Sequence, residues 1–214
     1  MSTRLKLLFS IILTTCAAQA HAQASTTLPL ETHAGFYSRE VGLTRALDPQ
    51  VFVADDGAPA GIGPQGITHA AGMRNAFVDE SDNRDLFDAH GEPLHMTLSQ
   101  WLGATGTVML SPQSNGTEKI DVSLSRLKPG ALYSLFENHF EKNSVRFTPL
   151  DGSGKGNSFR ADSQGAANIH VVAPAVLTHE NAVLVVLHSD GIAHGDKRGN
   201  LGVDAHHQLI ARLP

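Results

Sequence analysis

The clearest pattern in the chain is a series of short segments after residue 106 in which apolar residues alternate with polar ones or run together. At 120–125 three aliphatic residues alternate with polar residues, the period of two expected for a strand with one buried face. Residues 182–187 are apolar on both faces, which predicts a central strand. Turn residues separate these segments at regular intervals, a spacing typical of a β-sandwich.

We expect an all-β fold, an immunoglobulin-like or cupredoxin-like β-sandwich, over residues 94–214. Asn115-Gly116 favours a hairpin turn between the first two strands. A chain with only 6% aromatic residues but 20 Gly and 10 Pro fits such a fold better than a helix bundle. The expected strands are 107–111, 120–125, 131–137, 147–150, 158–161, 167–173, 182–188 and 206–213.

Two local signals refine this expectation. Thr97 as N-cap and Gly103 as C-terminal stop predict one or two helical turns that direct Trp101 and Leu102 to the core. The segment 127–133, Leu-Lys-Pro-Gly-Ala-Leu-Tyr, resembles the turn before a strand in immunoglobulin-like domains of the fibronectin type III kind. That resemblance implies a corner role for Tyr133.

Residues 1–22 have the pattern of a secretory signal peptide. Arg4 and Lys6 precede an uncharged run at 7–18, and A-x-A cleavage sites end at Ala20 and Ala22. The apolar run is too short to span a bilayer, which takes about 20 residues, and no later apolar stretch approaches that length. We therefore expect an exported protein, periplasmic or secreted. A lipobox-like arrangement ending at Cys16 leaves lipidation as the alternative.

Residues 23–93 show no regular period and are rich in turn residues. We interpret them as an irregular N-terminal arm whose short apolar pieces pack on the domain at 94–214. On this interpretation the arm adds little to stability, and a chain starting near Leu94 should unfold as one cooperative unit.

Charge and cysteine content exclude several classes of function. A net charge of −5, with no run of Lys and Arg longer than two, argues against a nucleic-acid partner. Cys16 is the single cysteine, so cleavage would leave no disulfide, thiolate nucleophile or Cys-based metal site. Residues 61–66 match G-x-G-x-x-G, but Pro64 and the absence of a strand–helix–strand pattern argue against a nucleotide cofactor.

Histidine and aspartate are concentrated near the C-terminus. Four His and three Asp occur within residues 188–207, in a segment rich in Gly. If the strands at 182–188 and 206–213 are antiparallel neighbours, His188 meets either His206 or His207 at one edge, since adjacent residues of a strand point to opposite faces. We expect these residues to hold a metal ion, copper or zinc: His188, His194, His206 or its substitute His207, with Asp190, Asp196 or Asp204 as fourth ligand or hydrogen-bond acceptor.

A copper–zinc superoxide dismutase is similar in class, an exported β-sandwich with His and Asp ligands on long loops, although its His-x-His pair and disulfide have no counterpart in this chain. The leading hypothesis is therefore an exported metal-binding protein. The alternatives are a metal-free binding or adhesion module for a small ligand, glycan or protein, and a metal-dependent hydrolytic or redox enzyme. In a purely structural alternative the same His and Asp residues only hydrogen-bond a long loop closed. His90, His95 and Met96 form a second, weaker group of candidate copper ligands.

Overall fold

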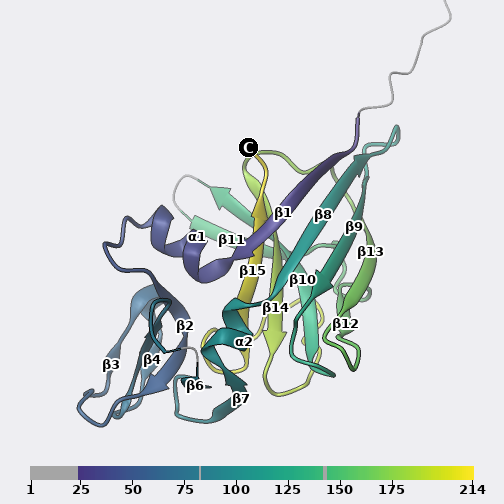
Figure 1. Ribbon diagram of the computed structural model, residues 1–214. Coiled ribbons are helices and arrows are strands. Elements are labelled where there is room, and N and C mark those ends of the chain that lie inside the picture. Colours follow the sequence, from purple (N-terminus) through teal and green to yellow (C-terminus); the bar gives the residue numbers. More distant parts are fainter. Residues whose placement is uncertain (1–23, 82, 142–143) are drawn as a thin grey trace, which may run out of the picture.

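The computed structural model describes residues 24–81, 83–141 and 144–214, with side chains 141 and 144 left aside. The expected signal peptide at 1–22, including Cys16, lies outside the described residues. The fold is mostly β (Figure 1), with two short α-helices in the described part, α1 (His33–Glu40) and α2 (Leu98–Leu102), and a 3-10 turn at Pro64–Gly66. The all-β class is confirmed, while the immunoglobulin-like or cupredoxin-like type stays a prediction.

The main sheet is antiparallel throughout and contains nine strands in the described residues. Each strand expected after residue 106 has a counterpart in it, with ends shifted by a few residues at most. In spatial order the strands are β11 (Ser144–Pro149), β10 (Leu132–Glu141), β14 (Asn181–His188), β15 (Ala205–Arg212), β1 (Thr26–Thr32), β8 (Thr105–Pro112), β9 (Glu118–Ser125) and β13 (Ala167–Ala173), and β12 (Ser158–Arg160) pairs with β10.

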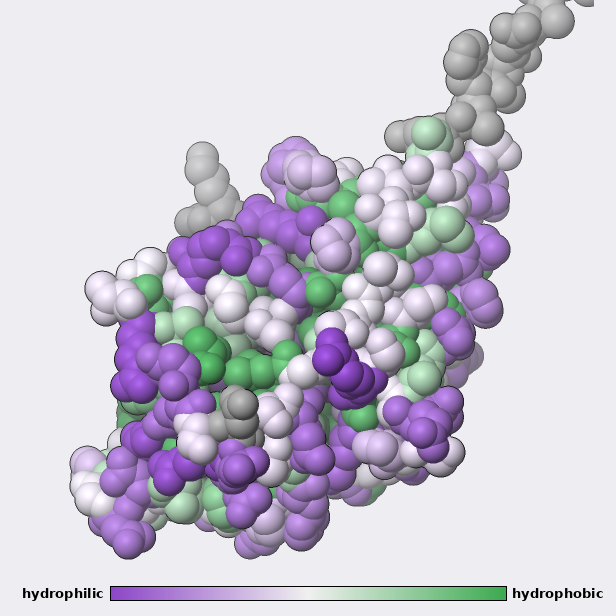
Figure 2. Space-filling model, viewed as in Figure 1, coloured by the Kyte–Doolittle hydropathy of each residue, from purple (hydrophilic) through white to green (hydrophobic). Residues whose placement is uncertain are grey.

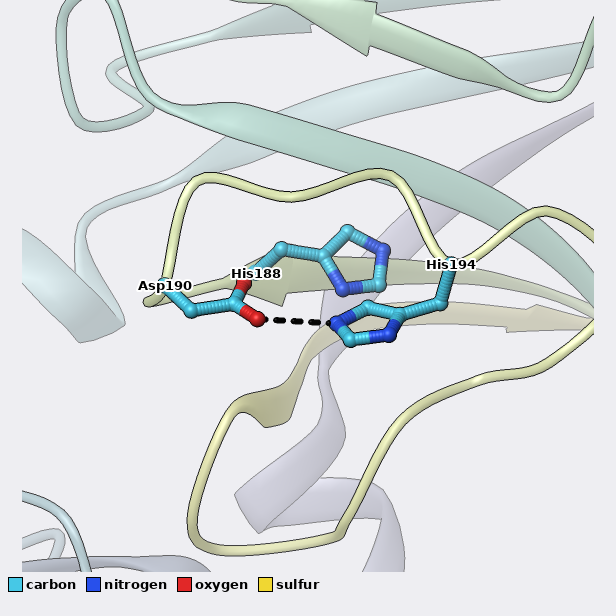
Figure 3. Close-up of side chains that lie close together, drawn as sticks. All are labelled: His188, Asp190 and His194. Carbon is cyan, nitrogen blue, oxygen red and sulfur yellow. Dashed lines mark hydrogen bonds and ion pairs between the residues drawn. The ribbon is translucent and has the colours of Figure 1, made fainter.

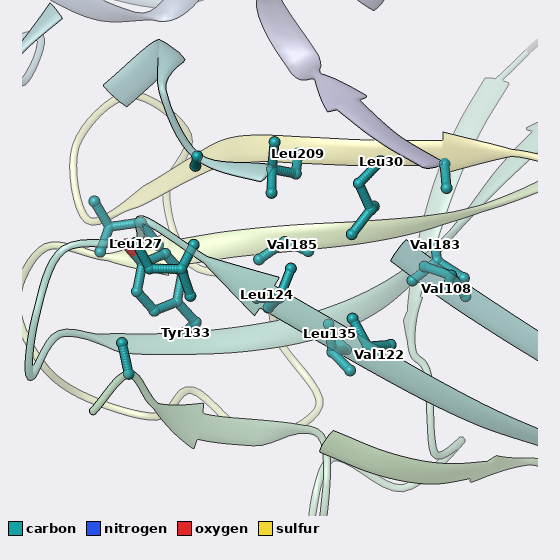
Figure 4. Packing of buried hydrophobic residues seen from close by; sticks show 14 of the residues in the cluster. Leu30, Val108, Val122, Leu124, Leu127, Tyr133, Leu135, Val183, Val185 and Leu209 are labelled. Carbon is teal, nitrogen blue, oxygen red and sulfur yellow. The ribbon is translucent and has the colours of Figure 1, made fainter. Parts of the chain in front are cut away.

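Strand β1 lies at the point where this sheet curls over itself. Its residues 26–30 pair with β8, and its last two residues pair with β15. The two halves of the sheet face each other across a shared core, which includes Leu30 of β1, Val122 of β9 and Val185 of β14 (Figure 4). Strand β14 lies between β10 and β15 and is buried on both faces, as its apolar run predicted.

Local sequence signals account for several of these elements. Thr97 accepts a hydrogen bond from the Gln100 N–H in a capping box, and α2 ends before Gly103, which confirms the expected helix. Gly116, at φ +84°, forms the turn between β8 and β9. The Tyr133 hydroxyl accepts a hydrogen bond from the Lys128 backbone N–H at 3.0 Å, the tyrosine-corner contact that the resemblance implied.

Residues 26–97, expected to form an irregular arm, consist largely of strands and one helix. Besides β1, they form a four-stranded sheet and a small two-stranded hairpin. The sheet has the order β5 (Met73–Phe77), β2 (Leu47–Ala54), β6 (Asp85–Phe87) and β7 (Pro93–Thr97), and the hairpin pairs β3 (Gly61–Ile62) with β4 (Thr68–His69). Val51 and Val53 of β2 belong to the same core cluster as the main sheet. Residues on both sides of the boundary expected between 93 and 94 therefore share one sheet and one core.

The face shown in Figure 2 is a mixture of hydrophilic residues and small hydrophobic patches. Within the described ranges, no helix has both the length and the apolar character needed to cross a membrane.

Candidate metal centre

Three of the expected ligands come together where β14 ends. His188 is the last residue of β14, and Asp190 and His194 follow in the loop 189–204 that leads to β15. One candidate ligand atom from each of the three lies within 4.8 Å of the other two. The rings of His188 and His194 face each other, with their centroids 5.1 Å apart, and the Asp190 carboxylate points at His194 (Figure 3).

His188 is oriented by a neighbouring strand. Its Nε2 lies 2.8 Å from Ser134 Oγ on β10, while its Nδ1 is buried and has no hydrogen-bond partner. A histidine that bonds the protein through one ring nitrogen and leaves the other free has the usual arrangement of a metal ligand. Burial, helped by His194, lowers the pKa of His188 to about 4, so its imidazole is neutral at physiological pH.

Asp190 and His194 are more accessible than His188. Asp190 Oδ1 accepts a hydrogen bond from the Ile192 N–H at 3.0 Å, which holds the carboxylate in place. Asp190 Oδ2 accepts one from His194 Nε2, also at 3.0 Å. Coordination through His194 Nε2 requires its proton to move to Nδ1, which a change of tautomer supplies.

Two imidazoles and a carboxylate form a donor set that suits zinc or copper. Around one ion, with bonds of ~2.1 Å, tetrahedral ligand atoms lie about 3.4 Å apart. Separations of up to 4.8 Å must therefore contract by up to about 1.4 Å on metal binding. Asp190 and His194 are on a loop and partly exposed, so small side-chain rotations can supply that contraction.

His206 and His207 lie outside this group and have other partners. Leu187 pairs with His206 across β14 and β15, so His206 points to the face opposite His188. His206 Nδ1 lies 2.9 Å from the Gln50 carbonyl oxygen and its Nε2 3.2 Å from Ser189 Oγ. His207 is on the same face as His188 but pairs with Val186, and its ring contacts that of His33, 4.8 Å away.

The remaining expected ligands also lie apart from the group. Asp204 accepts hydrogen bonds from the backbone and side-chain amides of Asn200, which closes the base of the loop. Asp196 is exposed on the same loop. In the weaker group, Met96 is buried in the core, whereas His95, its neighbour in β7, is exposed. Metal coordination by any residue of the chain stays a prediction.

Sequence reasoning missed Ser134 as the residue that orients His188. The available signal was a hydroxyl residue in the middle of the apolar run 132–136, at a position that proves to be buried. A buried hydroxyl needs a hydrogen-bond partner. Ser134 finds two, His188 Nε2 and Ser158 Oγ, the latter at 2.8 Å.

Comparisons of the chain with protein-family models, curated proteins and solved structures found no match.

Proposed function

We propose that this chain is an exported metal-binding protein that holds copper or zinc through His188 Nδ1, Asp190 and His194 Nε2. The observation that carries the proposal is the unpartnered, buried Nδ1 of His188, which lies beside a carboxylate and a second imidazole. An imidazole lone pair buried without a partner costs free energy, and a bound cation recovers it.

The three residues leave at least one coordination position for water or a substrate. Zinc enzymes with three protein ligands have this kind of open position, whereas structural zinc sites have four protein ligands. A hydrolytic or redox activity at the metal is therefore the second form of the proposal, and it requires that metal binding be shown first.

The test is thermal unfolding of the chelator-treated protein with and without Zn²⁺ or Cu²⁺. A metal that binds only the native state adds about 2.7 kcal/mol when its free concentration is a hundred times Kd. For a chain of this length, that corresponds to an increase in Tm of about 5 °C or more. Asp190→Asn and His194→Ala should each remove most of the increase.

His179→Ala is the matched control, because His179 is an exposed histidine outside the group. It should keep the full metal-dependent shift. A loop held closed only by hydrogen bonds predicts instead that Asp190→Asn and His194→Ala lower Tm in metal-free buffer while the wild type shows no shift with metal. That result, with no metal found by elemental analysis of protein purified without affinity metals, would overturn the proposal.

A further inference from the structure

A second pocket, of about 400 Å³, lies between α1, the β10–β11 hairpin and the loop 189–204. Its volume is in the range of small-molecule sites. Aromatic rings form much of its wall, including those of Phe36, Phe140 and Phe147. His33 and His207 also line it and are almost fully buried. None of these residues belongs to the candidate metal centre, so ligand binding in this pocket can be tested separately from metal binding.

The hydrogen bonds around His207 determine which of its ring nitrogens carries the proton. Gln50 Oε1 accepts a hydrogen bond from the His207 backbone N–H at 2.7 Å, so the side-chain nitrogen of Gln50 is its donor end. That nitrogen lies 3.1 Å from His207 Nδ1, which must therefore accept. The proton of His207 is on Nε2, a buried donor with no partner.

The same reasoning applies to His33. Its Nε2 lies 3.4 Å from His207 Nδ1, and because that atom accepts, His33 donates from Nε2. His33 Nδ1 is then a buried acceptor without a partner, and Asn138 Oδ1 is a second one on the same pocket wall. Burial lowers the pKa of His33 to about 3 and that of His207 well below its usual value, so both rings are neutral at pH 7.

Arg198 supplies the charge of this pocket. Its guanidinium lies 3.5 Å from the centroid of the Phe147 ring, and its Nη1 is buried without a hydrogen-bond partner. Burial lowers the pKa of Arg198 to about 10, which leaves it protonated at pH 7. Glu40, a carboxylate on the pocket wall, is already paired with Arg212 at 3.2 Å.

Arg198 differs from the other arginines stacked on phenylalanine rings in its lack of a carboxylate partner. Four more arginines lie over phenylalanine rings, and each also pairs with a carboxylate: Arg39 with Glu31, Arg45 with Asp79, Arg74 with Asp55 and Glu80, and Arg212 with Glu40. Among the described residues, Arg198 has no carboxylate within ion-pair distance. A half-buried cation without a counter-ion is costly, and an anionic ligand removes that cost.

We propose that this pocket binds a small aromatic monocarboxylate. The carboxylate pairs with Arg198 and accepts from His207 Nε2, both of which are donors. The aromatic body packs among Phe36, Phe140 and Phe147, where offset or edge-to-face ring contacts add to the burial of apolar surface. His33 Nδ1 and Asn138 Oδ1 are acceptors, so they favour ligands whose aromatic ring also carries a hydroxyl donor.

The test is calorimetric titration of the full-length mature chain with 3-phenylpropanoate and with its neutral analogue 3-phenylpropanamide. We expect saturable binding of the acid at one site, with the amide at least about tenfold weaker because it lacks the charge. Arg198→Gln should lower the affinity for the acid by about tenfold or more. Arg45→Gln, which alters another arginine stacked on a phenylalanine ring, should change the affinity by less than about twofold.

Asn138→Asp is a second variant. Asn138 is on β10, so this substitution leaves the sequence of the 189–204 loop unchanged. It adds a negative charge to the pocket wall and should also lower the affinity for the acid by about tenfold. Ring ¹⁵N resonances of His33 and His207 should shift on addition of the acid. No saturable binding at millimolar concentrations, equal affinity for acid and amide, or equal losses in Arg198→Gln and Arg45→Gln would each overturn the proposal.

Discussion

The buried histidines show how a single residue type takes different roles in this chain. His188 faces a carboxylate and a second imidazole with a free nitrogen, whereas His206 is held by the Gln50 carbonyl oxygen and His207 by the Gln50 side chain. The density of His and Asp at 188–207 predicted a site in this segment. The three residues that are close in sequence, His188, Asp190 and His194, lie together in the structure. Gln50, which holds both His206 and His207, is more than 150 residues away in sequence, and no local pattern reveals it.

Burial of neutral imidazoles predicts that the protein loses stability in acid. The pKa of His33 is about 3 in the folded chain and 6.5 in the unfolded chain, so between these values the unfolded state binds the extra proton. This stability is present above pH 6.5 and is lost as the pH falls below it. From pH 7 to pH 5 the loss is about 2 kcal/mol for His33 alone, and burial of His207 and His188 acts in the same direction.

Asp48 opposes this trend, because burial raises its pKa to about 6 and its protonated form is favoured in the fold. Its effect over the same pH range is about 1 kcal/mol, smaller than that of the three histidines together. Urea unfolding at pH 7, 6 and 5 measures the sum. His33→Gln should reduce the pH dependence, and His179→Ala should leave it unchanged. A wild-type protein as stable at pH 5 as at pH 7 would contradict this account.

Among the elements, those with a strong local signal were predicted well and those without one were missed. The strands after residue 106 have clear alternation or apolar runs bounded by turn residues, and α2 has a cap at each end. Strand β1 has a proline in its middle and only one buried residue, Leu30, so its sequence does not stand out. Strand β2 also contains a proline, and its pairing with β5 is interrupted between Leu47 and Phe52. The buried partners of Asp48 and Gln50 hold this part of the strand in place.

The capping box of α2 leads to a prediction for that element. Thr97→Ala removes the side-chain acceptor for the Gln100 N–H and should lower the free energy of unfolding by about 1 kcal/mol. Ser99→Ala, an exposed position within the same helix, is the control and should change it by less than about 0.5 kcal/mol. Chemical denaturation of the three proteins measures both values. Equal effects of the two substitutions would show that the cap does not stabilise the helix.

At the scale of the whole molecule, the sheet is completed by a segment that precedes it by more than 70 residues. Strand β1 lies between β15 and β8, and both of these strands come after residue 104. Alternation along one strand specifies which face is buried, but it carries no information about which strand lies alongside. The order of the strands in the sheet therefore could not be predicted from the sequence.

This topology predicts that the segment 24–93 is required for folding. A chain starting at His33 lacks only β1, which would leave the facing edges of β8 and β15 without hydrogen-bond partners. A chain starting at Leu94 additionally loses Val51 and Val53 from the core and Asp48, which accepts a hydrogen bond from Trp101 Nε1 at 2.8 Å.

We expect both truncated chains to be insoluble or to unfold without cooperativity, whereas a chain starting at Ala24 should unfold in one sharp transition. Calorimetry together with near-ultraviolet circular dichroism distinguishes these results. A cooperative transition for residues 94–214, at a Tm close to that of residues 24–214, would instead restore the boundary at residue 93 and show that the first 93 residues are an accessory to the fold.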